Sequence, residues 1–139
     1  MLSGAGCGEK EGDFRSAVIG IKGKEIRVEL ALTAEARFRG LKFRRELGKD
    51  AGMLFVFPRD VRHPFWMKET FLPLSIAFLD REGRIIRIAE MEPLNENKLY
   101  HSPRPYRYAL EMNQEWFDRN GVEAGDMISL NGRLTSAAR

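Results

Sequence analysis

The fold class follows from "LSIAFLDREGRIIRIAEM", Leu74 to Met91. Apolar and β-branched residues fill both halves of this stretch, and Arg81-Glu82-Gly83 separates the halves. Two strand-like runs joined by a short turn that contains glycine are typical of a β-hairpin. We therefore expect two adjacent antiparallel strands here.

Further strand patterns lie on both sides of this hairpin. Residues 16–32 predict a second hairpin, two strands joined at Lys22-Gly23, because Ile26, Val28, Leu30 and Leu32 alternate with Arg27, Glu29 and Ala31. The run "GMLFVFP", Gly52 to Pro58, is continuously apolar, as in a strand that is covered on both faces. Residues 106–112 and 125–130 each predict one more strand.

The segment "HPFWMKETFLPL", His63 to Leu74, predicts a strand framed by two prolines, because proline cannot donate to a sheet. Period-two alternation then assigns its side chains to two faces. One face would pack on the core with Phe65, Met67, Glu69 and Phe71, and the other would carry Trp66, Lys68 and Thr70. The second face is either a recognition strip, with aromatic area beside donors, or an indole at the core edge with Lys68 in water.

Two short helices complete the pattern. Thr33 suits an N-cap, and Ala34, Phe38 and Leu41 form one apolar stripe behind it. Residues 113–121 predict the second helix, which ends at Gly121, and residues 92–104 predict a long loop. The expected fold is all-β dominated, a mostly antiparallel β-sandwich or barrel-like domain with two short helices.

The chain of 139 residues predicts one domain over residues 16–130. Residues 1–15 are expected to form a flexible tether, and residues 131–139 an unstructured tail. The single cysteine, Cys7, excludes an internal disulfide and a cysteine-cluster metal site. The net charge of +3 is too small to demand a nucleic acid, so no specific nucleic-acid partner is expected.

The N-terminal "LSGAGC" looks like the end of a bacterial lipoprotein signal, with small residues before a cysteine. It favours export to the cell envelope or periplasm with a lipid anchor on Cys7, and therefore an exported domain. The alternative is a Gly-rich terminus with an accidental cysteine on a cytoplasmic protein.

The chain carries no recognisable catalytic motif, and we expect no cofactor and no metal site. His63 and His101 have no neighbouring ligand at helical spacing. Acidic residues such as Asp80, Glu111 and Asp126 could pair in space. The ligand-binding candidates are Arg39, Trp66, Lys68, Thr70, Glu111 and Asp126.

A cluster of basic residues lies in "RFRGLKFRRELGK", Arg37 to Lys49. It indicates either a solvated helix face or a surface for anionic membranes. The members of this basic patch are Arg37, Lys42, Arg44 and Arg45.

Several motifs together resemble the uncharacterised bacterial and archaeal family called domain of unknown function 192, over about Ile26 to Leu130. They are "RGL" at 39–41, "GMLFVF" at 52–57, "FWMK" at 65–68 with Thr70 and "PL" after it, "FLDREGRI" at 78–85, "ALE" at 109–111 and the "NG…GD" ending at 120–126. The resemblance implies a compact β-sandwich-like domain, often behind a signal sequence, with no established activity. This chain departs from the family at Glu69, where Asn is usual, and at Ser75, where Asp is usual.

Two functions remain open. The first is a non-catalytic, exported binding or interaction domain near the bacterial envelope, whose partner is a small ligand or an envelope protein. The second is an enzyme that acts on a small or saccharide-like substrate through scattered carboxylates and Lys68. Converging carboxylates of raised pKa in a cleft would favour the enzyme, and an aromatic and basic strip would favour binding.

Overall fold

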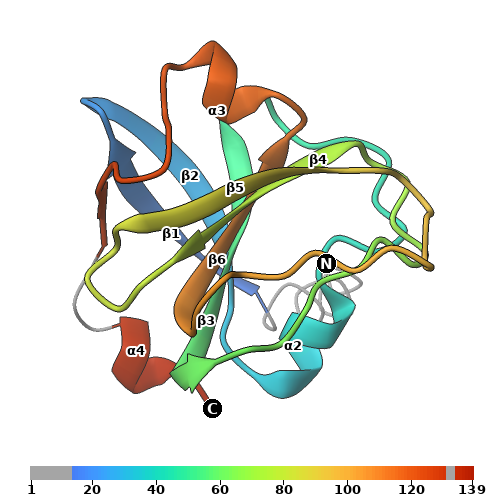
Figure 1. The fold of residues 1–139 in the computed structure, drawn as a ribbon, viewed down its shortest axis with the longest axis horizontal. Coiled ribbons are helices and arrows are strands. Elements are labelled where there is room, and N and C mark those ends of the chain that lie inside the picture. The colour runs from blue at the N-terminus through green and yellow to red at the C-terminus, as the bar shows by residue number, and fades with distance from the viewer. Residues whose placement is uncertain (1–13, 131–133) are drawn as a thin grey trace, which may run out of the picture.

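The computed structural model describes residues 14–130 and 134–139, which build one curled sheet with short helices around it (Figure 1). The sheet has seven strands in the order β5-β4-β6-β3-β2-β1-β7. The strands are β1 (Phe14–Ile21), β2 (Lys24–Ala31), β3 (Ala51–Val61), β4 (Leu74–Leu79), β5 (Ile85–Met91), β6 (Tyr106–Asn113) and β7 (Ile128–Ser129). The helices are α2 (Ala34–Arg39), α3 (Trp116–Arg119) and α4 (Leu134–Ala137).

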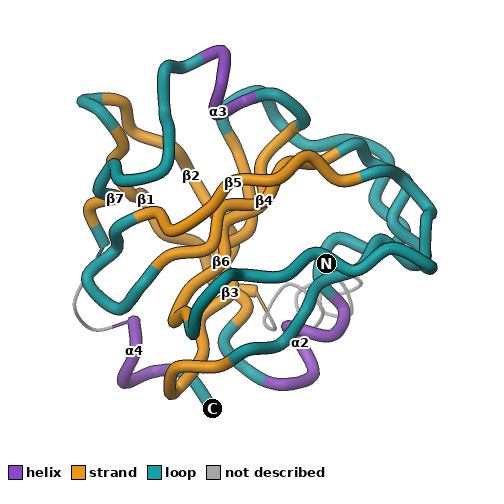
Figure 2. The backbone as a smooth tube through the Cα atoms, viewed as in Figure 1, coloured by secondary structure: helices purple, strands orange, loops and turns teal. Residues whose placement is uncertain are grey.

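Both predicted hairpins are present, β1 with β2 and β4 with β5. All neighbouring pairs are antiparallel except β2 and β3, which are parallel. A parallel pair needs a crossover connection, and the chain between β2 and β3 contains α2 (Figure 2). The N-cap of α2 is Thr33, as predicted, and its hydroxyl oxygen accepts a hydrogen bond from the Ala36 backbone N–H at 3.0 Å.

The two ends of the sheet approach each other through backbone hydrogen bonds. The Ile85 N–H donates to the Asp126 carbonyl oxygen at 2.9 Å, and the Ile128 N–H donates to the Gly83 carbonyl oxygen at 2.9 Å. Gly83 has φ of 94°, and a Cβ added there would meet the Ile128 carbonyl oxygen at 2.5 Å. Only glycine fits this turn. The sheet-dominated prediction is confirmed, in its barrel-like form rather than as a sandwich.

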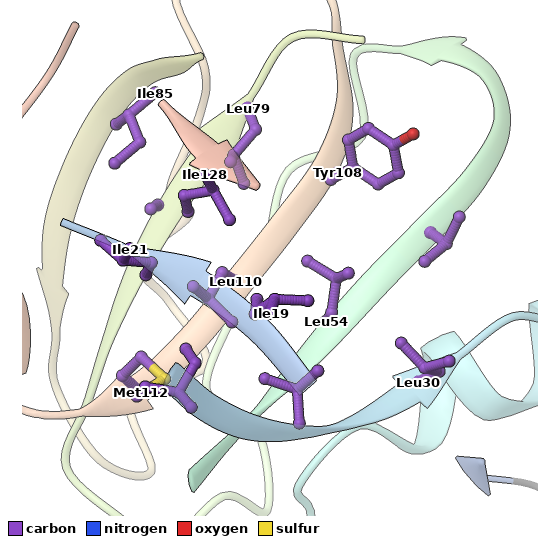
Figure 3. Packing of buried hydrophobic residues seen from close by; sticks show 14 of the residues in the cluster. Ile19, Ile21, Leu30, Leu54, Leu79, Ile85, Tyr108, Leu110, Met112 and Ile128 are labelled. Carbon is purple, nitrogen blue, oxygen red and sulfur yellow. The ribbon is translucent and has the colours of Figure 1, made fainter. Parts of the chain in front are cut away.

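The sheet has a hydrophobic core on each face. Residues such as Ile19, Leu54, Leu110 and Ile128 pack inside the curl (Figure 3). The other face carries a second core that includes Met53, Phe55, Phe57, Met67, Phe78 and Tyr106. Strand β3 contributes alternate residues to both cores, so the prediction that it is covered on both faces is confirmed.

The predicted strand between Pro64 and Pro73 is wrong. Phe65 makes one isolated bridge to Tyr100, and the chain then turns, with the Thr70 N–H donating to the Met67 carbonyl oxygen at 3.1 Å. The turn breaks the period-two alternation, so the two predicted faces are wrong as well. Met67 and Thr70 are both buried, whereas Trp66 and Phe71 are each 38% exposed.

Other local predictions also need correction. Of the predicted apolar stripe only Leu41 is buried, because Ala34 is exposed and Phe38 is 71% exposed; Ala36 is the buried residue of α2. Residues 134–137 form α4 where an unstructured tail was expected, because Leu134 packs into the inner core. Strand β1 starts at residue 14, inside the expected tether.

Cys7 lies outside the described residues. Among the residues that the structure places, no helix is both long enough and apolar enough to span a bilayer.

Candidate functional site

A pocket of about 320 Å³ opens on the outer face of the sheet, beside α2 and the turn at residues 63–70. We call it the aromatic pocket, because rings make up much of its wall. The ring-bearing side chains are Phe38, Phe55, Phe57, His63, Phe65 and Trp66. The other lining residues are Ala34, Arg37, Arg39, Gly40, Leu41, Lys42, Pro64, Met67, Thr70 and Glu111.

The inner walls are held by contacts between the rings themselves. Phe55 and Phe57 project from the same face of β3, since they are two residues apart. The Phe65 ring lies edge-on to Phe55 with centroids 5.0 Å apart. The His63 ring stacks on Phe57 at 5.7 Å, and the Tyr106 hydroxyl donates to the His63 carbonyl oxygen at 2.6 Å. These contacts fix a preformed cavity rather than a loose gap.

Glu111 supplies the acidic group of the pocket. It lies on β6 between two strands, opposite Met53 of β3 and Ile76 of β4, and is only 5% exposed. Gly52 allows β3 to approach so closely, because a Cβ there would collide with the Glu111 backbone carbonyl oxygen. The neighbours of Glu111 on β6, Leu110 and Met112, point into the core inside the curl. The alternation of β6 therefore directs Glu111 to the pocket face.

The Glu111 carboxyl group accepts no hydrogen bond from any residue in 14–130 or 134–139. Burial raises its pKa from 4.5 to about 8, and the nearby charge of Lys42 opposes this shift. In most molecules the Glu111 carboxyl group is therefore protonated at neutral pH. A protonated carboxyl can both donate and accept a hydrogen bond.

Lys42 lies at the mouth of the pocket. Its Nζ donates to the Lys68 carbonyl oxygen at 3.3 Å and lies 5.1 Å from the Phe38 ring centroid and 5.9 Å from that of Trp66. Loss of hydration lowers the pKa of Lys42, which the charges of Glu69 and Glu111 partly offset. The pocket therefore combines an ammonium group with a buried carboxyl group.

The sequence candidates divide between the pocket and other places. Arg39, Trp66, Thr70 and Glu111 line the pocket, and the buried Thr70 hydroxyl donates to the Lys68 carbonyl oxygen at 3.1 Å. The Lys68 side chain is not part of the lining, and its Nζ lies over the Trp66 ring at 5.3 Å. Asp126 lies elsewhere, with its Oδ2 3.6 Å from Lys22 Nζ and 2.8 Å from the Glu123 backbone N–H that it accepts.

The four residues of the basic patch each have different partners. Arg37 donates to the backbone carbonyl oxygens of Leu32, Val56 and Arg139 at 2.9, 2.8 and 2.7 Å. Arg44 makes a bidentate pair with Glu29 at 2.9 and 2.7 Å, and the guanidinium of Arg45 lies over the Phe71 ring at 5.4 Å. Lys42 is the member that lines the pocket together with Arg37.

Sequence reasoning missed several wall residues. Phe55 and Phe57 were assigned to the core of a strand, and Phe38 to the stripe of a helix. A ring in a pocket wall and a ring in a core give the same sequence pattern, so no signal separated the two. Lys42 was recognised only as one charge among several.

The two family departures, Glu69 and Ser75, lie outside the pocket lining. Glu69 has φ of 57°, a left-handed conformation that asparagine adopts more readily than glutamate. Ser75 is fully buried, donates to Glu90 Oε1 at 2.5 Å and accepts from the Glu115 backbone N–H at 2.9 Å. Among the described residues, no three His, Cys, Asp or Glu side chains are grouped to hold a metal ion.

Two solved structures are similar to this chain over most of its length. One is a protein from Sinorhizobium meliloti named a "putative transcription regulator", with 34% identity, a TM-score of 0.75, and coverage of 81% of this chain and 89% of that one. The other is a protein of unknown function from Novosphingobium aromaticivorans, with 31% identity, a TM-score of 0.78, and coverage of 83% and 85%.

None of the curated proteins matches the chain. Residues 17–130 match the family DUF192, described as "Uncharacterized ACR". This match covers most of the chain and agrees with the motifs around the pocket, so the chain belongs to the DUF192 family.

Proposed function

We propose that this domain binds a small organic ligand in the aromatic pocket, with Glu111 as the buried polar contact. The observation that carries the proposal is the carboxyl group of Glu111, which is buried and accepts no hydrogen bond from the described residues. No buried side-chain oxygen of the described residues lacks a partner, so the carboxyl oxygens of Glu111 keep contact with the open space of the pocket that it lines. A ligand in the pocket can therefore form a hydrogen bond with this carboxyl group.

The walls suit such a ligand. Small-molecule sites are concave and mostly apolar, with a few polar groups that fix orientation, and their volumes start at roughly 300 Å³. The aromatic pocket, at about 320 Å³, lies at the small end of this range. Thr70 and Glu111 are its buried polar side chains. A compact metabolite fits this site better than a polymer.

Binding is favoured over catalysis because the carboxylates do not converge. Asp80 accepts the backbone N–H groups of Glu82 and Arg84 in the β4–β5 turn, and Asp126 pairs with Lys22. One observation supports an enzyme as the second candidate. Glu111, with a pKa of about 8, and Lys42 both line one pocket and could exchange protons with a substrate there.

The cellular setting of the binding domain is also a proposal. The "LSGAGC" sequence supports export with a lipid anchor on Cys7. The name of the Sinorhizobium meliloti neighbour instead suggests a regulator, in which a ligand pocket would act as a sensor. The aromatic pocket would serve either role, so ligand binding can be tested before location.

A thermal-shift screen of a broad library of small metabolites tests the proposal. Each compound would be measured with the wild type, with Glu111→Leu and with Asp126→Asn, a control outside the pocket. We expect hits that raise the melting temperature of the wild type and of Asp126→Asn, but not of Glu111→Leu. The proposal fails if no compound binds, or if the hits stabilise all three proteins equally.

A further inference from the structure

We infer that the ligand is a small aromatic carboxylate, with its ring among the phenylalanines, its carboxylate on Lys42, and a hydroxyl or carbonyl substituent that reaches Glu111. This inference rests on the proposed function and narrows it to one class of ligand. The charge of the lining, the donors of Lys42 and the position of Glu111 each support one part of it.

The charge of the pocket lining favours an anion. Arg37, Arg39 and Lys42 are basic, and Glu111 is the acidic member of the lining. Because burial keeps Glu111 mostly protonated at neutral pH, the lining itself has a net positive charge; Glu69, whose charge also acts on Lys42, is not part of the lining. Aromatic faces also attract cations, but here the Lys42 ammonium already lies over Phe38 and Trp66. A cationic ligand would be repelled by it.

Lys42 has donors available for that anion. An ammonium group carries three N–H donors. In the part of the chain that the structure describes, the Lys42 Nζ has one hydrogen-bond acceptor, the Lys68 carbonyl oxygen at 3.3 Å. A carboxylate at the mouth would accept from the remaining donors in a partly desolvated place, where charge-assisted bonds are strong.

The body of the ligand is constrained by the walls and by Glu111. An aliphatic tail would cover the Glu111 carboxyl with carbon and leave it without a hydrogen bond, which is costly. A ring matches the walls, because Phe55, Phe57 and Phe65 offer edges and faces for ring contacts. A polar substituent on the ring then satisfies Glu111.

Isothermal titration calorimetry on the full chain tests this class with defined probes. They are para-hydroxybenzoate, benzoate, para-hydroxybenzamide, para-hydroxybenzylamine and octanoate. We expect para-hydroxybenzoate to bind about tenfold more tightly than its amide, as loss of one charge-assisted bond implies. Benzoate and octanoate should be weaker than para-hydroxybenzoate, and the amine weakest.

Lys42→Met separates the role of the mouth from general binding. It should reduce the affinity for para-hydroxybenzoate about tenfold and leave that for para-hydroxybenzamide unchanged. The control is Lys68→Met, because the Lys68 Nζ also lies near the Trp66 ring but its residue does not line the pocket. Circular dichroism would check that each variant is folded, and if Lys42→Met does not fold, the probe order on the wild type decides.

The outcomes distinguish this inference from the proposed function. If the amine or the amide binds the wild type as tightly as the carboxylate, or no carboxylate probe binds, the inference is wrong. The proposed function then still stands if the metabolite screen finds a neutral or cationic ligand that needs Glu111. If that screen also finds no ligand, both are wrong.

Discussion

Replacing Glu111 with glutamine should remove a pH dependence from the stability of the domain. In the folded protein, burial raises the pKa of Glu111 to about 8, whereas in the unfolded chain it should return to its ordinary value of 4.5. Between these two pH values the folded state holds a proton that the unfolded state has released. The free energy of unfolding must therefore fall as the pH rises through this window.

The size of the effect follows from the shift. A difference of about 3.5 pKa units, at 1.36 kcal/mol per unit, corresponds to roughly 5 kcal/mol. The stabilisation of the folded state by this proton is fully present below pH 4.5 and is lost by about pH 8. About two thirds of it is already lost at pH 7. Because Glu111 is only 5% exposed, solvent screening reduces this value little.

Urea denaturation from about pH 5 to about pH 9 would measure the effect in the wild type and in Glu111→Gln. The amide adds a constant offset, so the comparison uses the slopes against pH rather than the absolute values. The control is Glu82→Gln, because the Glu82 side chain lies in a turn and is 68% exposed. It should run parallel to the wild type.

The difference in the free energy of unfolding between the wild type and Glu111→Gln should therefore change by several kcal/mol over this pH range. The variant should gain stability relative to the wild type as the pH rises. Lys42 is the charged group that acts on Glu111, so the variant removes this coupling together with the carboxyl. A difference that stays within about 1 kcal/mol at every pH would refute the assignment of a strongly shifted carboxyl.

Other predictions concern single side chains. Glu69→Asn should stabilise the domain by about 0.5–1 kcal/mol in urea titrations, because asparagine tolerates the left-handed backbone at this position. A loss of stability would contradict the view that glutamate is strained there. Met67→Ala should cost about 2–5 kcal/mol, since Met67 is buried, and Phe71→Ala roughly half of that or less; equal losses would contradict the observed turn. Mass spectrometry of the full-length product from its native host should find lipid on Cys7, and an unmodified thiol would exclude the anchor.

The strand framework could be predicted from the sequence because its signals are local. The alternation of residues 26–32 and the turn residues Arg81-Glu82-Gly83 lie within the hairpins that they specify. The turn at residues 63–73 could not be predicted in the same way. Two prolines with apolar residues between them suit a strand end or a loop equally well. The backbone hydrogen bonds that hold this turn join Phe65 to Tyr100 and Thr70 to Leu94, which lie far along the chain.

The pocket lay beyond sequence reasoning for the same physical reason. Glu111 was named as a candidate, but only because a carboxylate there could pair with another acid. The structure brings it into one pocket with Lys42, whose charge acts on it; Lys42 lies in the loop after α2, and Glu111 lies on β6, beside β3 in the sheet. Such a meeting depends on strand order, which no local pattern encodes.

Stability and binding should therefore change in opposite directions when Glu111 is made apolar. A protonated carboxyl surrounded by Met53, Ile76 and aromatic rings costs stability, and above neutral pH the cost grows as the proton leaves. Glu111→Leu, of similar volume, should raise the free energy of unfolding at about pH 8 and abolish binding in the aromatic pocket. If Glu111 were only scaffold, the same substitution would leave ligand binding intact, or reduce it only in step with stability. Denaturation and calorimetry on this one variant separate the two cases.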